Sequence, residues 1–478
     1  MGRPTVYPTG VTVYKPEKCY NGVTLFPAAG YGAMLINMNG KVQRLWKDLQ
    51  GMPNKLLPGG YVLGHRGERD RAMSYQDRID LVQVDWQGNI VWQFNRHEWI
   101  ADEEVPPQWM ARCHHDYQRE GNSVGYYVPD RPPMVKGGNT LILAHVDIKK
   151  AKISPQNLLD DCIYEIDWQG NKLWEWKASD HFKDFGFSEL EKNAIYRNPN
   201  IQHCGPYGQG DWLHINSMSV LGDNQWYDQG DERFHPDNII IDSRETGILA
   251  IISKQTGEIV WRVGPDFTAS RALRQLEVIV GVHHCHMIPK GLPGAGNVLL
   301  FDNGGFSGYG APNQFSKTGL KVNRRDYSRV LEIDPLTLEI KWSFSAEDLG
   351  CKGPSVQHYF YSPLVSSAQR LPNGNTMITE GSSGRIIEVT LEKELVWEYI
   401  NPYFKNGGQS NAIYRAYRYP YDWVPQIGVQ EEQAVLPPDQ KTFRLPGADA
   451  GEFEDAAVAV EGTWGYAKGG AFCVESKQ

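Results

Sequence analysis

A hairpin pattern that ends in tryptophan and recurs six times constrains the fold more than any other feature of the sequence. The copies are Leu35–Trp46, Val82–Trp92, Tyr164–Trp174, Ala250–Trp261, Leu331–Trp342 and Ile387–Trp397. Each has alternating apolar and polar residues on both sides of a short polar or glycine-centred turn, which is typical of a β-hairpin. A large aromatic side chain at a corresponding place in every copy fits between packed sheets. The repeat therefore predicts six sheets that are built alike.

A second, looser pattern lies between these hairpins and supplies the rest of each sheet. It has a polar start, a Pro/Gly-Asn turn and an apolar strand, as in Lys55–His65 and Ala368–Gly381. Two inner and two outer strands make a four-stranded blade, and six such blades make a propeller. The 49 glycines and 29 prolines among 478 residues suit many tight turns. The predicted fold class is all-β, a six-bladed β-propeller with four-stranded blades.

The two ends of the chain indicate how the ring closes. Only Tyr20–Phe26 precedes the first hairpin, whereas the strand-like segment Ala412–Trp423 follows the last one. We expect this C-terminal strand to join the N-terminal blade. Residues 1–425 then form the catalytic propeller domain, and residues 426–478 form a tail that wraps around it. Helix is sparse, and the best candidate is Ser188–Arg197, which begins with a capping-box pattern.

Composition and charge argue against several classes of partner. The net charge is −9 and there is no block of Lys and Arg, so we expect no nucleic acid partner. No apolar stretch reaches the roughly 18 residues of a membrane helix, so we expect no membrane partner. The N-terminus has no signal-peptide pattern and the seven cysteines are scattered singly, which favours a reducing, cytoplasmic location. A processed exported chain and a homodimer both remain open.

Histidines gather where the innermost strands are expected to begin. These strands line the channel of a propeller, so the polar residues that open them are candidates for a site. Six of the 13 histidines lie in three such segments, and this clustering favours a functional site over separate structural histidines. They are His114, His115, His214, His283, His284 and His286. The sequence has no complete phosphate-loop, dinucleotide-binding, nucleophile-elbow or HExxH motif.

Several motifs resemble those of the arylsulfate sulfotransferases, six-bladed propellers that do not use the nucleotide sulfate donor. The resemblance covers roughly Tyr20–Trp423 and is specific in YNGVTLF, MLINMNGKVQRLW, HHD, HINS, the DSR strand, LLFDNG and SAQRLPNGNTMITEG. It implies a transferase that moves a sulfuryl group between phenolic compounds through a sulfohistidine intermediate in the channel. It implies no cofactor.

The resemblance also implies roles for single residues. In the family, two histidines, an asparagine and an arginine surround the sulfuryl group, and a third histidine becomes transiently sulfated. By its motif, His115 matches the first channel histidine, and His214 with Asn216 matches the HxN pair. Arg244, in the DSR strand, matches the arginine that binds the anion.

The transiently sulfated histidine is expected at the start of the next inner strand. His283 stands six residues before Pro289, as His214 stands six residues before Val220, so His283 aligns best. The doubled histidine of HHCH departs from the family, in which one histidine usually stands here. His284 therefore remains an alternative nucleophile.

The chemistry of these residue types fits sulfuryl transfer. An arginine fork holds two sulfate oxygens, and imidazole and amide groups donate to the others and protonate the leaving phenolate. Three further residues are expected to contact the substrate: His284, Asp116, which stands beside His115 and either orients its ring or ends a strand, and Tyr361 in the aromatic segment HYFYSPL.

Two other classes of function remain open. The first is a metal-dependent propeller enzyme that acts on small aromatic substrates, because converging imidazoles suit copper, iron or zinc. Its ligands would be His115, His214, His284 and His286. Asn216 with Arg244 suits an anion better than a cation, which favours sulfuryl transfer. The second is a non-catalytic binding propeller, since a fold does not imply a function.

Overall fold

The computed structural model describes residues 8–437, except 70–75, 103–104, 200–209, 351–355 and 406–408. The chain divides into two compact units, Met1–Leu436 and Pro437–Gln478. Residues 438–478 lie outside the described part of the chain. The division into a propeller of residues 1–425 and a tail of residues 426–478 stays a prediction.

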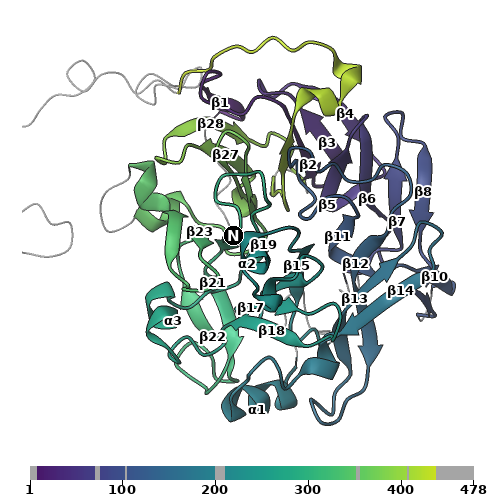
Figure 1. Cartoon of the computed structure of the whole chain (residues 1–478), viewed down its shortest axis with the longest axis vertical. Helices are drawn as coiled ribbons and strands as arrows, with labels where there is room; N and C mark the ends of the chain where they lie inside the picture. The colour runs from purple at the N-terminus through teal and green to yellow at the C-terminus, as the bar shows by residue number, and fades with distance from the viewer. Residues whose placement is uncertain are drawn as a thin grey trace, which may run out of the picture. The chain divides into compact units, whose positions relative to one another are not determined.

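Six antiparallel sheets of the first unit form a ring, which confirms the predicted six-bladed β-propeller (Figure 1). From the innermost strand outwards, three blades are β29 (Tyr417–Tyr419), β2 (Val23–Ala28), β3 (Gly32–Ile36) and β4 (Val42–Trp46); β5 (Gln50–Leu57), β6 (Tyr61–Arg66), β7 (Asp80–Val84) and β8 (Ile90–Phe94); and β11 (Cys113–Arg119), β12 (Thr140–Ile148), β13 (Leu158–Ile166) and β14 (Lys172–Lys177). The other three are β15 (Ile215–Val220), β16 (Ile239–Ser243), β17 (Ile248–Ile252) and β18 (Ile259–Val263); β19 (His283–Met287), β20 (Val298–Asp302), β23 (Arg329–Ile333) and β24 (Ile340–Phe344); and β25 (Ser367–Arg370), β26 (Thr376–Glu380), β27 (Arg385–Val389) and β28 (Leu395–Ile400). The innermost strands β5, β11, β15, β19 and β25 contact one another in this order, so the residues that open them lie close together.

The ring closes as the sequence predicts. The C-terminal strand β29 pairs with β2 of the N-terminal blade, with Tyr419 opposite Val23 and Tyr417 opposite Leu25. A second closure lies at the outer edge of the sixth blade, where β1 (Gly10–Tyr14) pairs with β28. The first and the sixth blade therefore each contain a strand from the opposite end of the chain.

A ring of six tryptophans links each blade to the next. Each indole N–H donates to a backbone carbonyl in the outer hairpin turn of the following blade, at 2.8–3.1 Å. They are Trp46, Trp92, Trp176, Trp261, Trp342 and Trp397. In the third blade, the predicted Trp174 pairs with Glu165 as Trp92 pairs with Gln83, so it has the expected strand register. Trp174 is half-buried, however, and the indole hydrogen bond comes from Trp176, two residues further along the same strand face. The bond from Trp397 to the Met38 carbonyl joins the sixth blade to the first.

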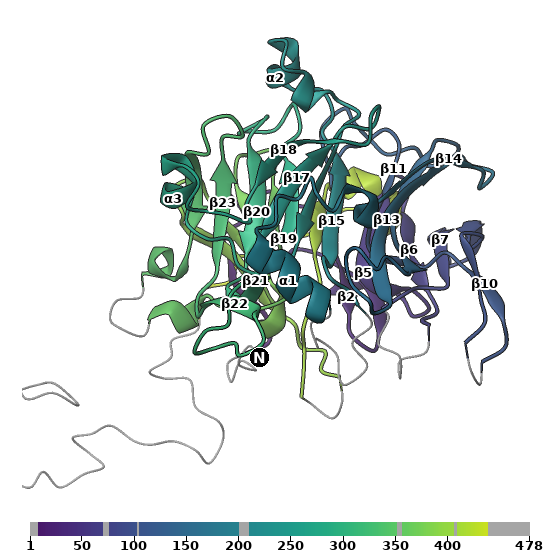
Figure 2. The ribbon, with the colours of Figure 1, turned by 90° about the horizontal axis from the view of Figure 1, so that it is seen from below.

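Inserted hairpins and helices lie between the blade strands along the chain. They are the hairpins β9 (Glu98–Ile100) with β10 (Gln108–Met110) and β21 (Gly305–Tyr309) with β22 (Leu320–Arg325), and the helices α1 (Glu189–Arg197), α2 (Gln225–Asp228) and α3 (Arg271–Leu276). The predicted helix is confirmed as α1, and Ser188 caps it in a capping box with Glu191. Helix α2 lies at one end of the ring and the β21–β22 hairpin at the other (Figure 2).

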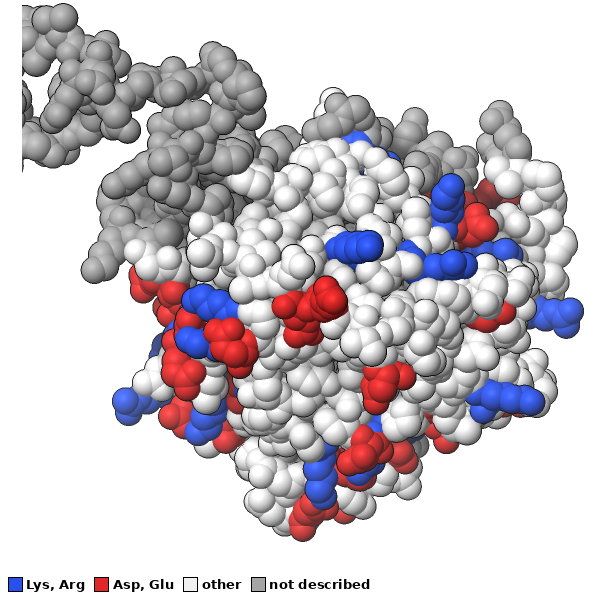
Figure 3. All heavy atoms as spheres, turned by 90° about the horizontal axis from the view of Figure 1, so that it is seen from above, with Lys and Arg blue, Asp and Glu red and all other residues white. Residues whose placement is uncertain are grey.

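On the face seen in Figure 3, acidic and basic side chains do not form separate patches. Acidic and basic side chains lie interspersed there, with uncharged areas between them. Within the described residues, no helix has the length and apolar character needed to cross a membrane.

Candidate functional site

Three histidines have a left-handed backbone where innermost strands begin. They are His115 in β11, His214 just before β15 and His284 in β19, with φ of +53°, +54° and +54°. At or beside each one, the pairing with the second strand of the blade shifts register. Positive φ is costly for a non-glycine residue and often marks a functional site. By this positive φ His284, rather than His283, resembles His214, although His214 precedes the first paired residue of its strand and His284 follows it.

His115 and His214 face each other from neighbouring blades. Their ring centroids are 4.7 Å apart and the rings are at 72°. Nδ1 of His115 lies 2.7 Å from Nδ1 of His114, so one ring donates to the other. Burial, reinforced by the nearby His214, holds the pKa of His115 well below its usual value. His115 is therefore a neutral imidazole whose Nδ1 is already occupied.

Asp211 orients His214, and the sequence analysis missed it. Its Oδ2 lies 2.6 Å from Nδ1 of His214. Burial disfavours the imidazolium, but the charge and hydrogen bond of Asp211 outweigh burial and raise the pKa of His214. Histidines whose surroundings push their pKa values apart suit acid–base chemistry. The i, i+3 spacing in DWLH is the only sequence signal, and it is too common to identify the pair.

Arg244 is held beside His214 by the turn that follows β16. Its amide donates to the His214 carbonyl at 3.1 Å, and the Glu245 amide donates to the Leu213 carbonyl at 3.3 Å. The guanidinium pairs through Nη1 with Glu245, and its carbon lies 5.0 Å from the centroid of the Phe306 ring. The side chain is 1% exposed, yet Nε and Nη2 have no hydrogen-bond partner among the described residues. A buried guanidinium with two unused donors suits an anion.

His283, in β19, contacts polar groups through both ring nitrogens. Nδ1 lies 2.8 Å from Oδ1 of Asn303 and 3.0 Å from the Gly281 carbonyl, so Nδ1 carries the proton. Nε2 accepts from the Val365 amide at 3.2 Å. Burial first, and the charge of Arg244 second, holds the pKa of His283 well below its usual value. The ring is therefore neutral with its lone pair on Nε2, as a nucleophile requires.

The ring-closing segment contributes Tyr414, which the sequence analysis did not assign to the site. Its hydroxyl donates to the Asn216 carbonyl at 3.2 Å, and its ring centroid lies 5.7 Å from that of His115 and 6.5 Å from that of His283. The side chain of Asn216 donates through Nδ2 to the Val282 carbonyl at 3.0 Å. Its Oδ1 is buried without a partner in the described part of the chain. Asn216 therefore holds the start of β19 and offers one unused acceptor.

Asp116 lies near this cluster but its carboxylate is engaged elsewhere. Oδ1 is 2.6 Å from Nζ of Lys55, and Oδ2 is 2.8 Å from Nη1 of Arg415. Burial raises the pKa of the Asp116 carboxyl, but these two cations outweigh it and lower that pKa. No hydrogen bond between described residues joins Asp116 to His115, and His115 meets His114 instead. Asp116 thus balances two buried cations.

His284 and His286 form a separate pair on the other face of β19. Their ring centroids are 4.5 Å apart, and their Nε2 atoms contact the hydroxyls of Tyr417 at 3.2 Å and Tyr126 at 3.0 Å. Within the described residues, no three of the proposed alternative metal ligands bring their ligand atoms within 4.8 Å of one another. Those ligands are His115, His214, His284 and His286. The structure brings them together as two pairs and not as one site.

Tyr361 is half-buried, and its amide donates to Oε1 of Glu380 at 3.0 Å. No contact between described residues joins its side chain to the histidines.

A cavity of about 430 Å³ lies at the opposite ends of the same innermost strands. Its lining includes Arg119, Val220 and Pro289. The histidines open these strands, whereas the cavity residues lie at or just beyond their ends, so this cavity is separate from the histidine cluster.

The fold and the site define a six-bladed β-propeller enzyme scaffold with buried histidines beside an arginine whose Nε and Nη2 have no partner among the described residues. The chain belongs to the arylsulfotransferase (ASST) family, whose model matches residues 133–409, more than half of the 478 residues. The predicted resemblance is thereby confirmed. Membership supports an arylsulfotransferase-like function, hence a transferase, and suggests phenolic substrates.

The other comparisons carry no argument about fold or function. No curated protein matches the chain. Similar solved structures include a Bacteroides caccae protein of unknown function, with 13% identity and a TM-score of 0.42, covering 84% of this chain and all of that one. Virginiamycin B lyase from Staphylococcus aureus has 11% identity and a TM-score of 0.32, covering 83% of this chain and 85% of that one. The Cps50 (Swd1) β-propeller domain of Myceliophteria thermophila has 10% identity and a TM-score of 0.34, covering 85% and 90%.

Proposed function

We propose that the protein transfers a sulfuryl group between phenolic compounds through a sulfohistidine at His283. The observation that carries the proposal is the buried Arg244 guanidinium, whose Nε and Nη2 have no partner among the described residues. These two donors match two oxygens of a sulfuryl group. Burial and the charge of Arg244 hold the pKa of His283 low, which favours the neutral imidazole that a nucleophile requires.

In the first step, Nε2 of His283 attacks the sulfur of an aryl sulfate. The nitrogen–sulfur bond forms while the bond from sulfur to the aryl oxygen breaks, and the electron pair goes to that oxygen. His214, held by Asp211 at 2.6 Å, donates its proton to the leaving phenolate. The Val365 amide, 3.2 Å from Nε2, is released from the nitrogen and is placed to donate to a sulfuryl oxygen.

In the second step, the oxygen of an acceptor phenol attacks the sulfur. His214, now neutral, takes the phenol proton. The nitrogen–sulfur bond breaks, and its electron pair returns to Nε2 of His283. The unused Oδ1 of Asn216 suits the acceptor hydroxyl, because it accepts a hydrogen bond and cannot donate one. His115 can donate to a sulfuryl oxygen only from Nε2, since Nδ1 meets His114.

The proposed reaction uses no nucleotide donor and no cofactor. A phenolic substrate and a cytoplasmic location accompany the proposal as predictions, and so does the absence of a nucleic acid or membrane partner. A homodimer stays open.

The test is to incubate the protein with para-nitrophenyl sulfate, quench it without an acceptor, and map sulfated peptides by mass spectrometry. We expect a label on His283 that is absent from His283→Asn and retained in the matched variant His286→Gln. Turnover that survives His283→Asn, with no labelled histidine in any peptide, would contradict the proposal.

A further inference from the structure

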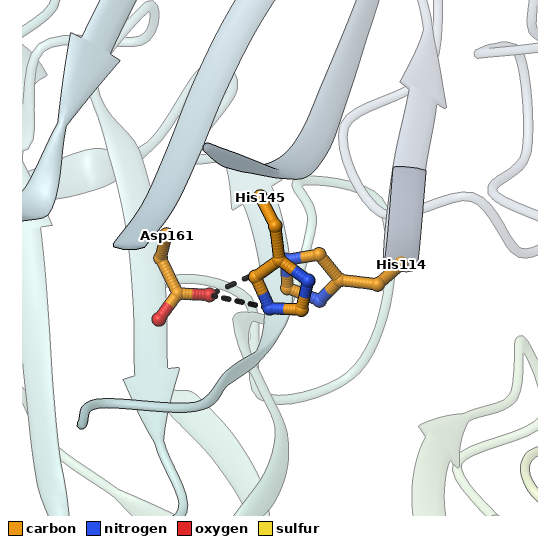
Figure 4. Close-up of side chains that lie close together, drawn as sticks. All are labelled: His114, His145 and Asp161. Carbon is orange, nitrogen blue, oxygen red and sulfur yellow. Dashed lines mark ion pairs between the residues drawn. The ribbon is translucent and has the colours of Figure 1, made fainter. Parts of the chain in front are cut away.

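Three buried side chains of the third blade converge next to the histidine cluster. His114 in β11, His145 in β12 and Asp161 in β13 come from adjacent strands of one sheet (Figure 4). Nε2 of His114 lies 3.3 Å from Oδ1 of Asp161, and Nε2 of His145 lies 4.0 Å from the same oxygen. Their side chains are 0–1% exposed. Within the described residues, they are the group of histidine, cysteine and acidic side chains with the spacing of a metal site.

The three atoms that face one another meet only as ion pairs, at 3.3 Å and 4.0 Å. By hydrogen-bond geometry, Nε2 of His114, Nε2 of His145 and Oδ1 of Asp161 have no partner in the part of the chain that is described. Most buried polar atoms in proteins have a hydrogen-bond partner, so three such atoms at one point suit a bound ion. Stacking of the two imidazoles, with centroids 3.6 Å apart and planes at 13°, keeps both Nε2 atoms on the Asp161 side.

The remaining polar atom of each side chain is anchored. Nδ1 of His145 lies 2.6 Å from Oδ1 of Asp77, whose other oxygen accepts from Arg112 at 2.8 Å. Oδ2 of Asp161 accepts from the Ile215 amide at 3.1 Å. A histidine whose second nitrogen donates to a carboxylate is the common arrangement behind a metal ligand. These contacts hold the three facing atoms in place without occupying them.

We propose that His114, His145 and Asp161 bind a divalent transition metal ion, with zinc as the favoured ion. Two neutral imidazoles and one carboxylate are a ligand set that zinc accepts, with a fourth position for water. Bonds of about 2.0–2.1 Å in a tetrahedral site separate the ligand atoms by roughly 3.3 Å. The observed 3.3 Å and 4.0 Å separations are close to this value, and the two stacked imidazoles must also turn so that their in-plane Nε2 lone pairs point at one ion.

This site differs from the metal site that the sequence suggested, because none of its ligands belongs to that set. Its consequence for catalysis rests on the proposed function. A metal on Nε2 of His114 leaves the proton on Nδ1, which then donates to Nδ1 of His115 across 2.7 Å. That tautomer puts the His115 proton on Nε2, as a donor to the sulfuryl group. We therefore infer that the ion positions a proton and does not contact the substrate.

The test is to strip the full chain with a chelator and titrate it with Co²⁺, which reports its ligands through visible absorption bands. We expect the wild-type chain to bind one Co²⁺, and Zn²⁺ to displace it. Asp161→Asn and His145→Gln should lose this binding, while the matched buried variant His286→Gln should retain it. Absence of stoichiometric binding to the wild type, or binding that survives both ligand substitutions, overturns the proposal.

A second measurement needs no variant, in case the ligand substitutions prevent folding. X-ray absorption of the Zn²⁺-loaded wild type should show two imidazoles and oxygen ligands around the ion. A spectrum with four imidazoles, or with none, overturns the assignment. Neither measurement uses an aryl sulfate, so failure of the metal site and failure of sulfuryl transfer are separate results.

Discussion

Arg244→Lys tests whether the arginine fork binds the transferring group. The Arg244 side chain is 1% exposed, and Nη1 is committed to Glu245. A lysine at this position has one ammonium group, which the adjacent Glu245 carboxylate retains. Both donors that have no partner among the described residues, Nε and Nη2, are then lost.

The size of the loss follows from these two donors. Hydrogen bonds to charged groups contribute about 1.5–3 kcal/mol each, so two contribute about 3–6 kcal/mol to the transition state. At about 1.4 kcal/mol per tenfold change in rate, kcat/KM should fall by roughly 10²–10⁴. Because the lysine keeps the ion pair with Glu245, the melting temperature should change little.

The assay is release of para-nitrophenolate from its sulfate ester with phenol as acceptor, alongside thermal unfolding. Arg119→Lys is the matched control: Arg119 is also buried with Nε and Nη2 unpartnered in the described region, but it lines the cavity at the opposite end of β11. We expect the control to keep its turnover. A folded Arg244→Lys variant within about threefold of wild type would refute the anion-binding role.

Two further substitutions test other parts of the structure. Asp211→Asn removes the group that raises the pKa of His214. An acid that must be protonated loses activity as the pH rises through its pKa. The alkaline limb of the pH–rate profile should therefore move to lower pH in this variant. An unmoved limb would exclude His214 as the acid. Trp397→Phe removes the buried bond to the Met38 carbonyl, and should lower the free energy of unfolding by about 2–4 kcal/mol through lost packing and an unsatisfied carbonyl. The half-buried Trp174→Phe should cost about 1 kcal/mol or less, and equal losses in urea unfolding would contradict the blade-to-blade role.

The propeller fold could be predicted from the sequence because the hairpin pattern is local and repeated. Alternation around a short turn forms a hairpin wherever it occurs, and six copies leave few alternatives to a ring of sheets. The closure by β29 followed from a strand without a partner at each end. The pattern alone did not show that Trp176 makes the hydrogen bond to the next blade, because Trp174 and Trp176 share a strand face.

The site was less readable, because its supporting residues come from distant segments with no motif of their own. Asn303 orients His283 from 20 residues away, and Tyr414 reaches Asn216 across 198 residues. His145 ends the apolar run TLILAH and has no motif around it that marks a ligand. Only pairing of β12 with its neighbours sets it beside His114.

The two adjacent histidines of β19 show that a similar backbone conformation does not give a side chain the same chemical role. By its positive φ, His284 is the counterpart of His214, yet its side chain lies among Tyr417, Lys55 and Arg415. Each histidine thus has its own arginine. Arg415 uses Nη1 on Asp116 and Nη2 on the Asn216 carbonyl.

Arg415 therefore has both terminal nitrogens committed and leaves only Nε without a partner among the described residues, so holding an anion beside His284 with two donors would require it to give up one of these bonds. Arg244 requires no such exchange, because Nε and Nη2 have no partner in the described chain. Breaking a buried ion pair is costly, whereas filling unused donors is favourable. The difference in unused donors between the two arginines thus favours His283 over His284 as the nucleophile. The repeat of the blades around the ring does not predict this difference. A sulfated peptide carrying the label on His284 would mean that Arg415, and not Arg244, binds the group.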